Sequence, residues 1–146
     1  MGKRILIADD GDEVRQVLRA IFEARTSYEI CGEAANGLQA VEKTLELKPD
    51  LILLDVAMPM LNGVEVASVL ARHMPELPIV LYTMYNELLG LSLATAVGAR
   101  AVVSKAEGMS KLLECVQNLL EPKEPAPAPE TTTSTIPVSK PPAASK

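Results

Sequence analysis

Aromatic residues are scarce in this sequence. They make up 3% of the 146 residues, and tryptophan is absent. Hydrophobic residues nevertheless reach 48%, which is enough for the buried core of one domain. We therefore expect a core of aliphatic side chains, built from leucine, valine, isoleucine and alanine. The length allows one domain followed by a tail.

The sequence also lacks the long apolar segments that membrane insertion requires. A transmembrane helix needs an uninterrupted apolar run of about 18 residues. The nearest candidate, 88–103, is interrupted by two glycines and Arg100. The N-terminus leads through a short apolar stretch to Asp9 and Asp10, which is not the pattern of a signal peptide. We therefore expect a cytoplasmic protein that does not insert into a membrane.

Patterned cysteines and excess positive charge are lacking as well. Cys31 and Cys115 have neither metal-site spacing nor a C-x-x-C arrangement, so we interpret them as small buried hydrophobic residues. The net charge is −5, and the charges after Leu120 cancel, so the excess belongs to the residues before it. A domain that grips nucleic acid needs a basic face, so we expect no direct nucleic acid binding.

Composition changes sharply near Leu120. Seven of the 11 prolines lie within 121–146, among threonine, serine and alanine, and no apolar periodicity remains there. Such a segment cannot bury enough apolar surface to offset the entropy of ordering. We therefore predict a folded domain over 1–120 and a disordered Pro/Thr/Ser/Ala-rich tail over 121–146.

Before the tail, short aliphatic runs alternate with longer amphipathic stretches. The short runs are typical of buried strands, and the stretches with apolar residues on one stripe indicate helices. The predicted strands are 4–8, 28–33, 51–54, 79–82 and 101–103, and the predicted helices are 12–25, 38–47, 63–73, 86–97 and 109–120. This alternation predicts an α/β fold, a three-layer sandwich with a parallel five-stranded sheet and five helices.

Polar residues stand at the predicted ends of four strands. They are Asp9 and Asp10 after the first, Asp55 after the third, Thr83 after the fourth and Lys105 after the fifth. The ligand crevice of such a sheet lies at these carboxyl ends, so the groups should converge. Three carboxylates repel one another unless a cation lies among them, and their hard oxygens suit Mg²⁺. With a threonine and a lysine to bind phosphoryl oxygens, the set predicts phosphoryl transfer to a carboxylate.

Each of these residues alone would be weak support. A single aspartate at a strand end is more often a helix N-cap or a turn residue than a nucleophile, and we expect Asp12 to be such a cap. Placement of the whole set on strand ends is much harder to obtain by chance, so it favours a functional site.

The sequence resembles response-regulator receiver domains of two-component signalling over residues 3–120. The resemblance is carried by ILIADD at 5–10, by DVAMPMLNG at 55–63, and by Gly98 and Ala99 followed six residues later by Lys105. It implies a flavodoxin-like strand order 2-1-3-4-5, as in a chemotaxis member of the family. Around 31–40 the sequence is also similar to the receivers of transcriptional regulators.

The resemblance implies how the site handles phosphate. Asp55 is expected to take a phosphoryl group from a phosphohistidine of a sensor histidine kinase or a phosphotransfer protein. Thr83 and Lys105 are each expected to bind a phosphoryl oxygen. Gly63 is expected to free the backbone where the third helix begins.

The resemblance also implies a Mg²⁺ site. Asp10 and Asp55 are the expected side-chain ligands, and the main-chain carbonyl of Ala57 is the third protein ligand. Asp9 is expected to act through a bound water.

In the family, phosphorylation shifts the face formed by the fourth helix, the fifth strand and the fifth helix. An aromatic residue of the fifth strand turns inward, but here that position holds Val102, so an aromatic rotation cannot report phosphorylation. The predicted helix 86–97 carries leucines in excess of a core stripe, which indicates either a wider core contact or a partner surface. Such a surface would serve a homodimer or the docking of a kinase through helices 4 and 5. Ala106 stands where many relatives have proline, and we predict a trans peptide bond before it.

We interpret the chain as a single-domain response regulator that acts on a downstream protein target, not as an enzyme. Two alternatives remain: the receiver portion of a transcriptional regulator lacking its DNA-binding domain, and a receiver-like scaffold that works without phosphorylation. A phosphohydrolase with an aspartate nucleophile is disfavoured, because those enzymes place a second aspartate where Ala57 stands. No glycine-rich Walker loop is present, so we expect no kinase activity.

Overall fold

The computed structural model describes residues 2–83 and 98–121. The strands are β1 (Arg4–Ala8), β2 (Glu29–Ala34), β3 (Leu51–Asp55), β4 (Ile79–Thr83) and β5 (Ala101–Ser104). The helices are α1 (Asp12–Arg25), α2 (Gly37–Leu47), α3 (Gly63–His73) and α5 (Met109–Leu120), with a 3₁₀ turn at Lys105–Glu107. The predicted helix 86–97 lies outside the described residues, as does the predicted tail apart from Glu121.

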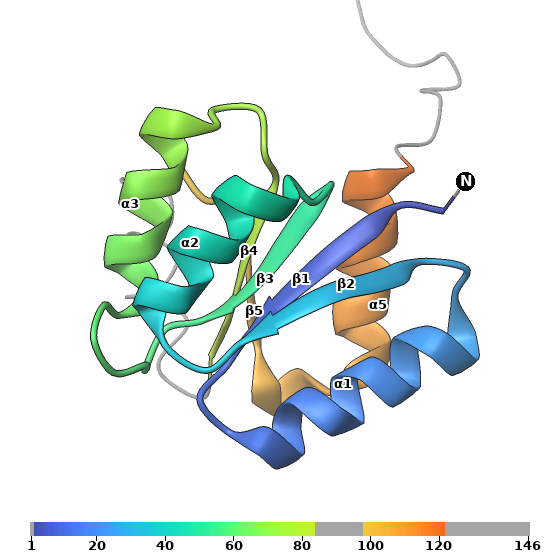
Figure 1. Ribbon diagram of the computed structural model, residues 1–146. Helices are drawn as coiled ribbons and strands as arrows, with labels where there is room; N and C mark the ends of the chain where they lie inside the picture. The colour runs from blue at the N-terminus through green and yellow to red at the C-terminus, as the bar shows by residue number, and fades with distance from the viewer. Residues whose placement is uncertain (1, 84–97, 122–146) are drawn as a thin grey trace, which may run out of the picture. The chain divides into compact units, whose positions relative to one another are not determined.

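The five strands form one parallel sheet in the order β2-β1-β3-β4-β5, which confirms the predicted flavodoxin-like α/β sandwich. The chain divides into two compact units, residues 1–116 and 117–146. The boundary falls within α5. Within the first unit, α2 and α3 cover one face of the sheet, and α1 and the first part of α5 cover the other (Figure 1).

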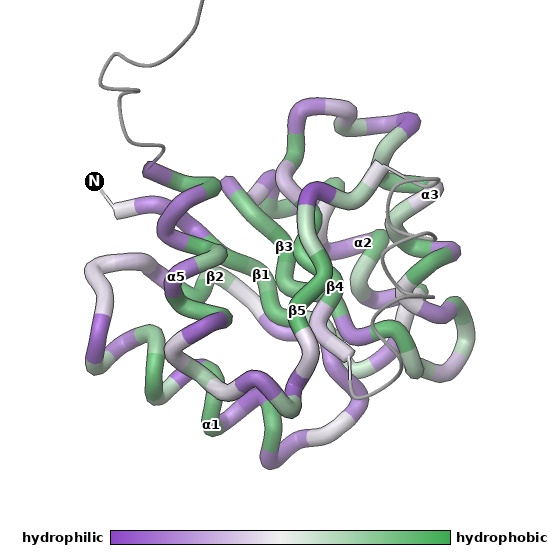
Figure 2. The backbone as a smooth tube through the Cα atoms, turned by 180° about the vertical axis from the view of Figure 1, so that it is seen from behind, coloured by the Kyte–Doolittle hydropathy of each residue, from purple (hydrophilic) through white to green (hydrophobic). Residues whose placement is uncertain are grey.

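The core is mainly aliphatic, as predicted, although Phe22, Tyr28 and Tyr82 are also buried in it, and it lies on both faces of the sheet. Alternate residues of β1, β3 and β4 face α2 and α3, where they form a cluster with Val66 and Leu70 of α3. The intervening residues are buried too, so β3 and β4 are buried along their whole length. This two-sided burial explains why the strands read as continuous hydrophobic runs, which Figure 2 shows in green.

The starts of α2 and α3 are fixed by asparagine caps. The side chain of Asn36 accepts a hydrogen bond from the Gln39 amide at 2.8 Å. Asn62 and Glu65 form a capping box, in which each side chain accepts from the other residue's amide at 2.9 Å. Helix α1 differs from our prediction: its N-cap is Gly11, without a side-chain cap, and Asp12 is the first helical residue.

The cysteines also differ from our prediction, because both are only partly buried. Cys31 lies on β2 and Cys115 on α5, and both are free thiols. Burial raises the pKa of each thiol, so neither is an activated nucleophile. The predicted trans bond before Ala106 is confirmed, since no cis peptide occurs among the residues described.

The loop from β3 to α3 depends on Gly63 for a steric reason. Its amide donates to the Val56 carbonyl at 2.8 Å, and a Cβ added there would lie 2.3 Å from the carbonyl oxygen of Asp55. Gly63 has no positive φ, so we correct the expectation that it frees the backbone: it permits a close approach of two backbone segments. The residue that does adopt a left-handed φ in this loop is Met60, at 76°.

Replacing Gly63 by alanine should therefore destabilise the fold. Because a backbone carbonyl occupies the space that the new methyl group needs, we expect a loss of about 1–3 kcal/mol in the free energy of unfolding, measured by urea denaturation. Gly11→Ala is the matched control, since the nearest atoms to its added Cβ lie at 3.4 Å, and should cost a few tenths of a kcal/mol. Equal losses in the two variants would refute the steric explanation.

Candidate functional site

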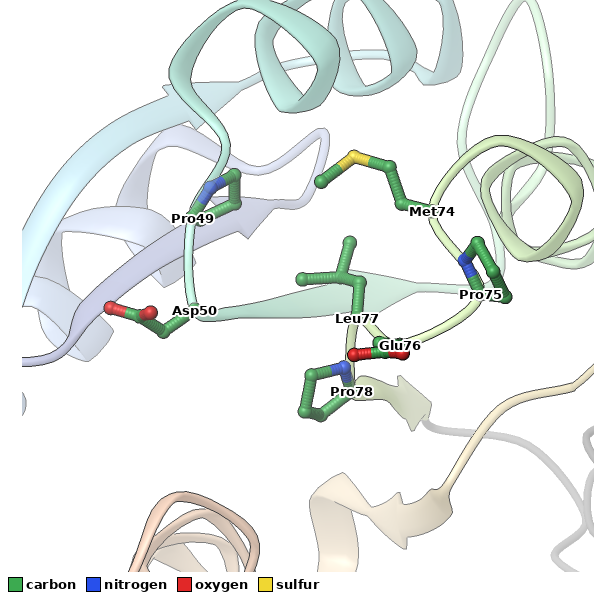
Figure 3. Close-up of a pocket in the computed structure, with 7 residues that line it drawn as sticks. All are labelled: Pro49, Asp50, Met74, Pro75, Glu76, Leu77 and Pro78. Atoms are coloured by element: carbon green, nitrogen blue, oxygen red, sulfur yellow. The ribbon is translucent and has the colours of Figure 1, made fainter.

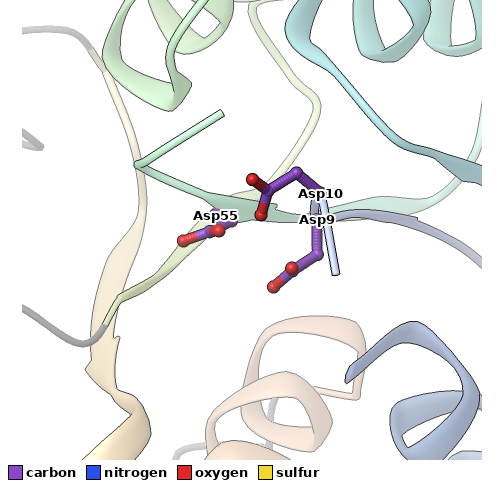
Figure 4. A group of neighbouring side chains, drawn as sticks. All are labelled: Asp9, Asp10 and Asp55. Carbon is purple, nitrogen blue, oxygen red and sulfur yellow. The ribbon is translucent and has the colours of Figure 1, made fainter. Parts of the chain in front are cut away.

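Three of the predicted acidic residues meet at the carboxyl edge of the sheet. Asp9 and Asp10 follow β1, and Asp55 is the last residue of β3. One carboxylate oxygen from each lies within 4.8 Å of the other two. Figure 4 shows the three side chains as neighbours. Asp9 and Asp55 are buried, whereas Asp10 is exposed. The structure thus confirms that the strand ends bring these carboxylates together.

The backbone of the β1–α1 loop fixes Asp9. Its amide donates to the Ala34 carbonyl at 3.0 Å, which extends the pairing with β2 by one residue. Its carboxylate accepts from the Gly11 amide at 2.8 Å, and its carbonyl accepts from the guanidinium of Arg15. The Asp9 carboxylate is therefore held by the start of α1 as well as by β1.

Lys105 reaches this cluster from the 3₁₀ turn that follows β5, an edge strand of the sheet. Its ammonium lies 2.9 Å from a carboxylate oxygen of Asp9 and 3.7 Å from one of Asp55. The 3₁₀ turn that carries it is capped by Ser104, whose hydroxyl accepts from the Ala106 amide at 3.1 Å. The Lys105 side chain is only 14% exposed, so water screens these ion pairs weakly.

The two remaining predicted residues lie beside the cluster. Thr83 is buried at the end of β4, in register with Ser104 of β5 and one residue after Tyr82, the register partner of Asp55. The backbone of Ala57 lowers the pKa of the Asp55 carboxyl, which places Ala57 close to that carboxylate. The roles of Thr83 and Ala57 as phosphoryl and metal ligands stay predictions.

The electrostatics of the site are dominated by the burial of Asp55. Burial and then the neighbouring charge of Asp9 raise the pKa of Asp55 to about 6, against the opposing effects of Lys105 and the Ala57 amide. The pKa of Lys105 is raised as well: desolvation lowers it, but the hydrogen bond to Asp9 and the charges of both aspartates outweigh that. The site therefore holds more negative charge than its single lysine balances.

This donor set fits a divalent cation with oxygen preference. Three carboxylates are close enough to share one ion, and among the described residues Lys105 is the only cation that forms an ion pair with the two buried ones. A hard ion such as Mg²⁺ binds through few protein carboxylates and retains water, which the exposed position of Asp10 permits.

A salt-bridge cluster behind the site was not foreseen from the sequence. Glu33, at the end of β2, accepts from Arg15 at 3.0 Å and from Arg19 at 2.7 Å, both on α1. Arg15 also bonds the Asp9 carbonyl, so the cluster connects β2, α1 and the acidic loop. The spacing of Arg15 and Arg19 by one helical turn was the available signal, but their partner on β2 depends on the tertiary fold.

Two cavities flank the sheet at opposite ends. A cleft of about 300 Å³ lies beside the acidic cluster and is lined by Glu13, Val14, Val17, Tyr82, Lys105 and Met109. A larger cavity of about 460 Å³ lies at the other edge, where the chain enters β3 and β4. Figure 3 shows Met74, Leu77 and Pro49 gathered there, with Asp50 pointing away from them. The larger cavity therefore does not mark the candidate site, because the charged groups converge at the opposite end of the sheet, beside the smaller cleft.

The fold and the acidic cluster together define a receiver-type signalling domain. The model of the response regulator receiver domain family matches residues 5–117, and the chain belongs to this family. Receiver domains are the phospho-accepting domains of two-component systems and generally use Mg²⁺ at their acidic site. Among the described residues, no helix is long and apolar enough to cross a membrane.

The relatives differ in their overall architecture. The chemotaxis protein CheY of Thermotoga maritima is 34% identical over 82% of this chain and 98% of its own length. The transcriptional regulatory protein YhcZ of Bacillus subtilis is 34% identical over 78% of this chain, which spans 53% of that protein. The crystal structure of the response regulator TrrA of T. maritima, in complex with Mg²⁺ and BeF, is 33% identical and matches with a TM-score of 0.73 over 81% of this chain and 99% of that one.

The raised pKa of Asp55 predicts a stabilising substitution. In the metal-free protein, ionised Asp55 lowers the free energy of unfolding. This loss of stability grows as the pH rises from about 4 to about 6 and reaches its full size above pH 6. Asp55→Asn removes the charge, so at pH 8 it should raise the free energy of unfolding by up to about 3 kcal/mol, and the gain should vanish near pH 4.

The control for this measurement is Asp10→Asn, which removes an equal charge from an exposed position and should raise the stability much less. Denaturation with urea in the presence of a chelator measures both variants. A gain for Asp55→Asn that is equally large at pH 4 would show that charge burial is not its cause.

Proposed function

We propose that Asp55 is the phosphoryl acceptor of a response regulator that a sensor histidine kinase or a phosphotransfer protein phosphorylates. The observation that carries the proposal is the buried Asp55 carboxylate, which lies within reach of both Lys105 and two further carboxylates. A carboxylate oxygen of Asp55 attacks the phosphorus of the donor phosphohistidine, the P–N bond breaks, and the imidazole leaves with the bonding electron pair. The product is an aspartyl phosphate.

The residues around Asp55 supply positioning and charge. The Lys105 ammonium lies 3.7 Å from a carboxylate oxygen of Asp55. It can therefore pair with the negative charge that the phosphoryl group brings. The Thr83 hydroxyl, at the adjacent strand end, is proposed to donate to a phosphoryl oxygen. We propose that Asp10, Asp55 and the Ala57 carbonyl hold Mg²⁺, with Asp9 acting through water, and that the ion offsets the charge of the carboxylates and the phosphoryl group.

Similarity to relatives supports this proposal. TrrA is 33% identical to this chain and has a similar overall structure, and its crystal structure contains Mg²⁺ and a beryllium fluoride. CheY of T. maritima, which the chain covers almost completely, favours a regulator that acts through protein contacts. YhcZ, of which the chain spans about half, keeps open the alternative of the receiver portion of a transcriptional regulator.

Phosphorylation of Asp55 can be tested with a small donor. Incubation with Mg²⁺ and acetyl phosphate should add one phosphoryl group, detected by intact-protein mass spectrometry and lost at alkaline pH, whereas Asp55→Asn should remain unmodified. Lys105→Met should slow the modification about 100-fold or more, because a positioned charge opposite the transferred group is lost.

The matched control is Lys111→Met, which removes an exposed lysine from α5 and should leave the rate unchanged. Modification of the Asp55→Asn variant at the wild-type rate would sink the proposed function. Phosphorylation that needs no divalent ion would sink the metal assignment alone.

We further propose that the signal leaves the site through β5 and α5, together with the predicted fourth helix. Val102 of β5 is paired with Leu81 of β4 and packs against the core cluster next to α3, so it is close to the carboxyl edge but carries no polar tip. The residues that connect Lys105 to the rest of the domain are β5 before it and the turn into α5 after it.

Addition of beryllofluoride and Mg²⁺ should therefore shift the amide NMR signals of 101–104 and 105–112 more than those of Glu29–Ile30 on the opposite edge strand. Loss of these shifts in Lys105→Met would support coupling through this lysine. Shifts confined to Asp9, Asp10 and Asp55 would refute signalling through β5 and α5.

A further inference from the structure

Lys105 has a neutral partner besides its two carboxylates. Its ammonium lies over the ring of Tyr82, 5.3 Å from the ring centroid. This distance is within the range of a cation–π interaction, in which the negative face of the ring attracts the cation. Because the Lys105 side chain is only 14% exposed, the attraction acts where water competes little.

The sheet register places this ring beside the phosphoryl acceptor. Tyr82 is the direct neighbour of Asp55 in the β3–β4 pairing, and register partners in a parallel sheet point to the same face. Tyr82 is 4% exposed and lies inside a strand that is buried along its whole length. The backbone of the sheet therefore fixes where the ring stands relative to Asp55.

The two carboxylates cannot hold Lys105 in the same way throughout the reaction. Asp9 and Asp55 also belong to the acidic cluster. A cation bound there would compete with the lysine for their carboxylate oxygens. The ring of Tyr82 is no ligand for Mg²⁺ and carries no charge, so its contact with the ammonium does not depend on the occupancy of the metal site.

The adjacent cleft contains a competing partner for the ammonium. Tyr82 and Lys105 line this cleft of about 300 Å³ together with Val14, Val17 and Met109, and Glu13 is a further lining residue. Because Lys105 and Glu13 line the same cleft, we expect an ammonium that is not held over the ring to turn into this cleft. We propose that Tyr82 is a positioning residue, whose ring holds the Lys105 ammonium at the phosphoryl site.

The test begins with the metal-free protein and does not depend on the proposed function. Acylation of lysines by acetic anhydride, read out by peptide mass spectrometry, reports how well each ammonium is held. Tyr82→Phe keeps the ring and should leave the acylation rate of Lys105 close to that of the wild type. Tyr82→Leu removes the ring and should raise it about 3- to 30-fold, while exposed Lys111 serves as the internal reference.

A second variant separates the ring's charge distribution from its shape. Pentafluorophenylalanine at position 82 fills nearly the same volume as phenylalanine but reverses the polarity of the ring face, so it should raise the acylation rate of Lys105 like Tyr82→Leu. This variant also covers the case in which leucine does not support folding. Equal rates for phenylalanine and its fluorinated form would show that the ring only fills space, and would overturn the inference.

The consequence for phosphotransfer rests on the proposed function. At saturating Mg²⁺, the rate of Asp55 modification by acetyl phosphate should fall about 3- to 30-fold in Tyr82→Leu and in the fluorinated variant, and Tyr82→Phe should retain the wild-type rate. Absence of modification in the wild type would defeat the proposed function and leave the acylation result standing. Normal modification in all three variants would overturn the positioning role of Tyr82.

Discussion

Mutual repulsion among Asp9, Asp10 and Asp55 is the constraint on which the rest of the site depends. The sheet brings their oxygens within 4.8 Å of one another, and two of the three side chains are buried. Within the part of the chain that the structure describes, Lys105 is the one cation that pairs with these carboxylates, and the pKa of Asp55 remains raised to about 6 despite it. The folded chain thus holds an excess of negative charge that a divalent cation relieves.

The parts of the molecule that hold this unfavourable cluster lie on rigid elements. Strands β1 and β3 are adjacent in the sheet, and their aliphatic residues are buried on both faces. The loops are pinned by backbone contacts: Gly63 packs against the carbonyl of Asp55, and Arg15 bonds that of Asp9. Stability from the aliphatic core therefore offsets the electrostatic cost at one edge, and the loops have little freedom to relieve it by moving apart.

The sequence predicts this site well because strand ends are a local property. Hydrophobic runs end at Asp9, Asp55 and Thr83, and parallel strands must gather their carboxyl ends at one edge. Features that depend on three-dimensional packing were missed or misread. Asp12 follows a strand and looks like a cap, but the chain turns one residue earlier, at Gly11. The cation–π contact between Tyr82 and Lys105 requires the β4–β5 register and the 3₁₀ turn after β5, which no local pattern encodes.

In the function that we propose, Lys105 transmits a change of charge at the site to the rest of the domain. Its ammonium is bound to Asp9 and near Asp55, so a cation or a phosphoryl group at these carboxylates alters the force on the lysine. The lysine lies in the turn between β5 and α5, and its backbone must follow or resist that force. With Val102 in place of an aromatic residue, no large side chain of β5 turns to report the change. We therefore expect the turn between β5 and α5, with Lys105 beside the ring of Tyr82, to pass the change from the site toward the surface.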